Sequence, residues 1–149
     1  MHQSHYKGLI TMTILSFITM YFLMFAMVDT PSNIFIGINQ FYMAGLMTAP
    51  MILIEIITMR SMYTNKNKNT VITLATTLTL IIFFLLIRNQ TAITDKEFLK
   101  SMIPHHAGAL LMCQEADLKD PEIKQLCEQI IQNQQAEIEV MKQKLQTIK

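Results

Sequence analysis

Three long apolar stretches constrain what this chain can fold into more than any other feature. They cover residues 8–28, 35–59 and 70–87, and Glu55 is the only formally charged residue within them. A helix of about 20 apolar residues crosses the roughly 30 Å hydrocarbon core of a bilayer. The whole chain of 149 residues is 51% hydrophobic and 15% charged, which is too apolar for an ordinary soluble domain. Residues 1–90 are therefore predicted to form a three-span membrane region in contact with lipid.

The positive charges predict how these spans are oriented. Lys7, Arg60, Lys66 and Lys68 lie before the first span or between the second and third, whereas the link between the first two spans contains no lysine or arginine. Basic residues favour the cytoplasmic side of a membrane. We expect a multi-pass protein of the bacterial inner membrane whose C-terminal part faces the periplasm or exterior.

Residues 94–147 carry the signals of two helices joined by a short turn. Thr94 and Glu97 have the spacing of a capping box, and Asp120 and Pro121 supply an N-cap and a proline at the first helical position. The predicted fold is therefore all-α, with three transmembrane helices followed by an extramembrane antiparallel helical hairpin. Two amphipathic helices bury little apolar surface by themselves, so we expect a homo-oligomer in which the hairpins form a helical bundle.

Soft metal ligands gather on one face of the first of these two helices. On an ideal helix they fall within an arc of about 120°. They are Met102, His105, His106, Met112 and Cys113. Copper(I) favours thioether, thiolate and imidazole, and it suits this set better than zinc does.

The predicted copper site lies beside the two adjacent histidines. Folding the hairpin about residue 120 places Gln134 opposite His106 and brings the second helix alongside the first. The expected ligands are His105, His106, Met102, Met141 and Met112, with Gln134 or Glu137 orienting an imidazole through a hydrogen bond. The alternative is a pair of ordinary histidines at the edge of a helical core.

Cys113 and Cys127 allow two interpretations. Their facing positions near the turn suit a disulfide in an oxidising compartment, which would close a loop of about 15 residues and contribute about 3 kcal/mol. As thiolates they would instead bind copper or zinc. The disulfide is favoured because the chain has no Cys-x-x-Cys motif that would support a closed metal site.

The second apolar stretch also contains possible copper ligands. Met43, Met47, Met51 and Glu55 recur every four residues on one ridge, which would suit a metal path through the membrane. A helix-packing ridge is favoured instead, because the chain has 13 methionines and methionine serves as flexible filler in apolar cores.

Two short patterns connect the chain to a known family. Residues 102–106 read Met-Ile-Pro-His-His, and Gln134, Glu137, Ile138 and Met141 form a Gln-x-x-Glu-Ile-x-x-Met pattern. From about Thr94 to Leu145 the sequence resembles the bacterial family called domain of unknown function 305. The resemblance implies a helical bundle, and it implies copper binding because members of the family include periplasmic copper-binding proteins.

Other functional classes find little support in the sequence. No glutamate lies three residues before either His105 or His106, as di-iron bundles require, and no basic stripe interleaves with aromatic residues as in nucleic-acid binders. We therefore expect a non-enzymatic, membrane-anchored copper(I)-binding protein for copper tolerance or handling in the periplasm. Two alternatives stay open. One is a structural membrane oligomer whose hairpin binds itself or a partner without metal, and the other is copper transport through the methionine-lined membrane region.

Overall fold

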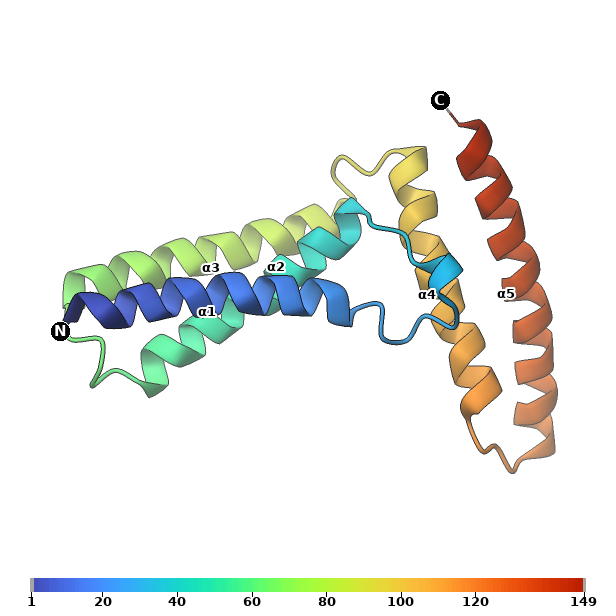
Figure 1. The fold of residues 1–149 in the computed structure, drawn as a ribbon, viewed down its shortest axis with the longest axis horizontal. Coiled ribbons are helices and arrows are strands. Elements are labelled where there is room, and N and C mark those ends of the chain that lie inside the picture. The colour runs from blue at the N-terminus through green and yellow to red at the C-terminus, as the bar shows by residue number, and fades with distance from the viewer. Residues whose placement is uncertain (1, 149) are drawn as a thin grey trace. The chain divides into compact units, whose positions relative to one another are not determined.

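The computed structural model describes residues 2–148, with side chains from His5 onward, and these residues form an all-helical fold without β-strands. The all-α class expected from the sequence is confirmed. In chain order the elements are α1 (His2–Leu23), the 3-10 helix η1 (Pro31–Asn33), α2 (Ile38–Thr58), α3 (Lys66–Arg88), α4 (Asp95–Glu115) and α5 (Pro121–Thr147), as Figure 1 shows.

Three of these helices are long and apolar enough to cross a membrane. They are His5–Leu23 with 19 residues, Ile38–Thr58 with 21 and Lys66–Arg88 with 23. The first ends earlier than the expected Val28, and the second begins later than the expected Phe35. The reason lies in tertiary packing, because Val28 and Phe35 both pack against an apolar cluster on α4 and α5 instead of extending the apolar helices.

The chain divides into two compact units. The first contains the chain up to Leu23 together with Asn39–Thr91, and the second contains Met24–Ile38 together with the chain from Ala92 onward. Residues 24–38 thus join the C-terminal helices, whereas the sequence had placed residues 1–90 together in one membrane region.

Helices α1, α2 and α3 of the first unit are held together by aromatic packing. The ring of Phe41 contacts those of Phe17 and Phe83, with centroids 5.1 and 6.0 Å apart. Gly45 on α2 faces the ring of Phe83 so closely that a Cβ atom at this position would overlap it. The absence of a side chain at Gly45 therefore lets α2 and α3 approach each other.

A polar cluster ties the same three helices together at one end. Tyr63 Oη donates to Glu55 Oε1 at 2.7 Å, and Tyr6 Oη donates to Asn69 Oδ1 at 2.7 Å. Asn69 Nδ2 in turn donates to the Tyr63 carbonyl oxygen at 2.6 Å. Burial, together with the hydrogen bond to the Glu55 carboxylate, raises the pKa of Tyr63 to about 12.

In the second unit, α4 packs against α5. The buried side chains between them are Ile103, Ala107 and Leu110 on α4 and Ile138 on α5. Partly buried residues complete this core, namely Val28, Phe35, Ile131, Met141 and Leu145. The segment between α1 and α2 therefore contributes to the same core as the two C-terminal helices.

The caps of α4 and α5 follow the sequence signals with one difference. Thr94 accepts from the backbone N–H of Glu97, and the Asp120 carboxylate accepts from Glu122 N and Ile123 N at 2.8 and 3.2 Å. The reciprocal half of the capping box does not form as expected, because the Glu97 carboxylate instead accepts from Ile38 N at 2.8 Å. Glu97 thereby fastens the 24–38 segment to the first turn of α4.

Candidate metal-binding groove

His106 is the polar residue at the centre of the α4–α5 contact. It lies on the buried face of α4 and is only 9% exposed. Its Nδ1 is 3.0 Å from the Met102 carbonyl oxygen one turn earlier, and its Nε2 is 2.7 Å from Glu137 Oε2 on α5. The ring is therefore held from both sides in one orientation.

The partners of His106 restrict where protons can be. A carbonyl oxygen and a carboxylate oxygen are both acceptors, so a neutral imidazole, which has one N–H, satisfies only one of them. The tautomer therefore decides which of the two oxygens the ring N–H faces, and the other ring nitrogen presents its lone pair.

A groove of about 410 Å³ opens beside this pair, between α4 and α5. Its walls are mainly apolar, and they bring the imidazole and two thioether side chains to the same surface. The lining residues are Phe98, Met102, His106, Ala136, Glu137, Val140 and Met141. Of the expected ligands, Met102, His106 and Met141 thus meet at one groove.

Two other expected ligands lie elsewhere. His105 is exposed, its ring centroid is 6.2 Å from that of His106, and it does not line the groove. Met112 is 53% exposed and also does not line it. Among residues 2–148, no three His, Cys, Asp or Glu side chains gather closely enough to hold a metal ion. Metal binding at this groove would therefore depend on the thioethers.

The partner of His106 differs from the residue placed opposite it by the sequence. The sequence placed Gln134 there and gave Gln134 or Glu137 as the residue that orients the imidazole; the structure shows Glu137, about one helical turn further along α5. Helical side chains lean toward the N-terminus of their own helix. The imidazole therefore reaches away from the turn joining α4 and α5, and Glu137 leans back to meet it. The four-residue spacing of Phe98, Met102 and His106 is the sequence signal that marks this face of the groove.

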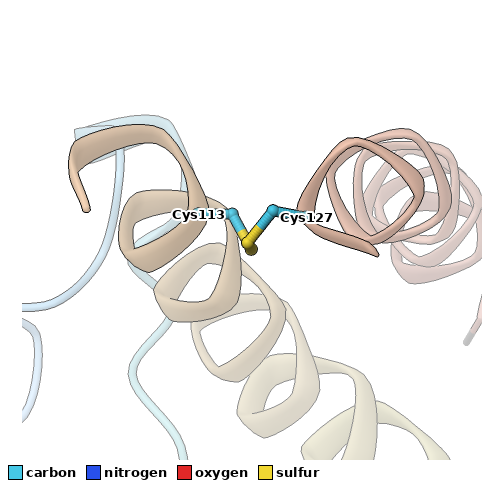
Figure 2. Close-up of a disulfide and its surroundings, with 2 residues drawn as sticks. All are labelled: Cys113 and Cys127. Atoms are coloured by element: carbon cyan, nitrogen blue, oxygen red, sulfur yellow. A yellow bond between two sulfur atoms is a disulfide. The ribbon is translucent and has the colours of Figure 1, made fainter. Parts of the chain in front are cut away.

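The two cysteines form a disulfide, which confirms one of the two interpretations of their spacing. Cys113 on α4 and Cys127 on α5 are joined with their Cα atoms 5.3 Å apart, and Figure 2 shows the two side chains pointing toward each other. Neither sulfur is a free thiolate in this state. The cysteines therefore cannot serve as metal ligands while the disulfide is intact.

The membrane methionines do not converge. Met43 and Met47 are exposed on the surface of the first unit, Met51 is half-buried, and Glu55 is hydrogen-bonded to Tyr63. A cavity of about 130 Å³ between α1, α2 and α3 is lined by other side chains, which include Thr48 and Thr76. None of these methionines lines that cavity.

Comparison with known proteins identifies the family. The family described as "Domain of unknown function (DUF305)" matches residues 59–145, more than half of the chain. The chain belongs to the DUF305 family. The match begins before α3, so the DUF305 region includes the third apolar helix as well as α4 and α5, and it is wider than the resemblance seen from about Thr94.

One known protein is similar to this chain over most of its length. "Uncharacterized protein L153" from Acanthamoeba polyphaga mimivirus is 40% identical over 111 residues, which cover 73% of this DUF305 chain and 71% of the relative. No solved structure matches the chain.

Proposed function

We propose that this chain is a membrane-anchored copper(I)-binding protein that holds the ion in the groove between α4 and α5. One observation supports this most directly, which is that Met102, His106 and Met141 line the same groove. Imidazole and thioether are ligands that copper(I) favours, and harder ions such as calcium or magnesium do not use them. The role is copper tolerance or handling.

The hydrogen bonds of His106 suit this proposal. If Nδ1–H donates to the Met102 carbonyl oxygen, Nε2 has its lone pair free beside the groove. Histidine ligands of metals usually donate their other N–H to such an oxygen, which fixes the tautomer. A cation bound at Nε2 then lies beside the Glu137 carboxylate, which compensates its charge.

We further propose that α1, α2 and α3 cross the membrane and that α4 and α5 form an extramembrane hairpin. The packing of Val28 and Phe35 onto the α4–α5 core supports this, because it keeps the link between the first two crossings on the same side as the C-terminal helices. The basic residues favour the opposite side as cytoplasmic, and the disulfide suits an oxidising compartment such as the periplasm. The bacterial inner membrane fits this topology, although the mimivirus relative shows that similar chains also occur in a virus.

Copper(I) titration of the full chain in detergent micelles tests the proposal. The disulfide is kept intact, oxygen is excluded, and a coloured chelator competes for the ion. We expect one copper(I) per chain. His106→Ala, Met102→Leu and Met141→Leu should each lower the affinity at least about tenfold, since losing even a supporting residue of a metal site costs about 10- to 100-fold.

Two variants serve as matched controls in this titration. Met112→Leu removes a thioether from the same helix, and His105→Ala removes the adjacent imidazole, but neither residue lines the groove. Both should bind copper as the unmodified chain does. The proposal is wrong if the chain takes up no stoichiometric copper, or if the control variants lose as much affinity as the groove variants.

A structural role without metal is the second candidate, and a specific observation favours it. Several large apolar side chains of the α4–α5 pair are about half exposed, and association with a second chain would bury them. They are Phe98, Met112, Ile123, Leu126 and Val140. In this alternative the chains assemble through these faces into a helical bundle. Chemical crosslinking in micelles would show the oligomer, and copper uptake would be absent.

A further inference from the structure

A second groove lies at the end of the α4–α5 pair that carries the disulfide. It has a volume of about 340 Å³, and both Cys113 and Cys127 line it together with the charged residues Asp117, Lys124 and Glu128. Both cysteines are partly exposed. A dissolved thiol can therefore reach the sulfur atoms without opening the core of the second unit.

We propose that reduction of this disulfide creates a second copper(I) site, in which the thiolates of Cys113 and Cys127 bind one ion. A dithiol reductant supplies two electrons and two protons, so the S–S bond breaks, two S–H groups form and the reductant becomes a cyclic disulfide. Copper(I) then displaces the two thiol protons and forms two Cu–S bonds without changing its oxidation state. The site does not depend on the Met102–His106–Met141 groove.

The packing of α4 and α5 keeps the two sulfur atoms opposite each other after reduction. The Cα atoms are 5.3 Å apart, and the chain between them is a short turn followed by the Asp120 cap. The buried cluster that includes Ile103 and Ile138 joins the two helices independently of the disulfide. The thiols are therefore presented as a pair before any metal binds.

The surroundings favour copper(I) over zinc. Structural zinc sites use four protein ligands, but within the described chain no three His, Cys, Asp or Glu side chains are placed so that they could hold a metal ion. Thiolates are among the soft ligands that select copper(I), so a two-thiolate site suits this ion best.

The test compares copper(I) uptake by oxidised and reduced full-length chain in detergent micelles. The reduced sample is treated with dithiothreitol, desalted without oxygen and titrated against a competing chelator. We expect the reduced chain to bind one copper(I) more than the oxidised chain and to show no such increase with zinc(II). The Cys113→Ser/Cys127→Ser variant, treated in the same way, should bind as the oxidised chain does.

Three outcomes would overturn the inference. These are equal copper uptake by the two forms, an extra ion that persists in the double serine variant, or loss of helical circular dichroism on reduction, which would mean that no preformed thiol pair exists. The copper site proposed at His106 is tested independently, because copper bound there is measured in the oxidised chain, in which the disulfide is intact.

Discussion

Glu97 joins two segments of the second unit through one carboxylate. Oε1 accepts from Lys100 Nζ at 2.8 Å and Oε2 accepts from Ile38 N at 2.8 Å, while the side chain is 15% exposed. Burial by itself raises the pKa of Glu97, but the hydrogen bonds from Lys100 and Ile38 and the positive charges of Lys100 and Lys96 lower it below the ordinary value of 4.5. The ionised carboxylate therefore stabilises the folded chain.

We predict that Glu97→Gln lowers the stability of the second unit by about 1.5–3 kcal/mol at neutral pH, the range for hydrogen bonds to charged groups. Because the folded-state pKa is lowered, the contribution of Glu97 is present above pH 4.5 and is lost as pH falls through the folded-state value. Thermal unfolding followed by circular dichroism between neutral and acidic pH measures this. Lys119→Gln, which removes an exposed cation, is the control. Identical pH profiles for Glu97→Gln and the unmodified chain would refute the prediction.

Glu137 has a separate role beside His106. We predict that Glu137→Gln weakens copper(I) binding by about tenfold without abolishing it, because the amide keeps the shape of the side chain but no longer compensates the charge of the ion. Competitive titration measures the change. Glu139→Gln, which removes an exposed carboxylate from the same helix, should leave the affinity unchanged. An unaltered affinity in Glu137→Gln would mean that this carboxylate takes no part in binding.

At the scale of elements, the close approach of α2 and α3 depends on Gly45. We predict that Gly45→Val destabilises the first unit by about 1–3 kcal/mol, because the added atoms overlap the Phe83 ring and force the helices apart. Thermal unfolding in micelles measures the loss. Gly8→Val is the matched control, since no other atom lies within 4 Å of a Cβ built there. Adding Phe83→Ala to Gly45→Val should recover part of the stability, and no recovery would argue against the overlap.

The helices themselves were predictable from the sequence because their signals are local. Apolar length marks the three candidate spans, and Thr94 and Asp120 mark where α4 and α5 begin. The pairing of Cys113 with Cys127 followed from their equal distances from the turn. Each of these features can be predicted because it depends only on the spacing of residues within one segment or across one short link.

The remaining features depend on contacts that no local pattern contains. Val28 and Phe35 are as apolar as the residues of a membrane span, so only their packing on α4 shows why the helices end where they do. Similarly, helix positions alone place Gln134 opposite His106, whereas the lean of the side chains selects Glu137. The sequence therefore limited the partner of the imidazole to Gln134 or Glu137, and only the packing of the two helices decides between them.

For the whole molecule, we predict that residues 24–38 and the C-terminal helices lie on one side of the membrane and residues 59–65 on the other. Single cysteines introduced at Ser32, Thr147 and Ser61 of the Cys113→Ser/Cys127→Ser variant test this, because all three positions are exposed. In intact cells that produce the protein, a thiol reagent that cannot cross membranes should label Ser32→Cys and Thr147→Cys. Ser61→Cys should react only after permeabilisation. Labelling of Ser32→Cys and Thr147→Cys from opposite sides would exclude three crossings.

The packing of the 24–38 segment on α4 also has a consequence for biosynthesis. In the proposed topology, Val28 and Phe35 leave the ribosome and cross the membrane before the residues they pack against have been made. They contact the apolar residues of α4 and α5 only after α3 has been inserted into the membrane and α4 has crossed it. Burial of these two side chains therefore marks a completed chain, and a product truncated before α4 would keep them open to chaperones and quality-control proteases.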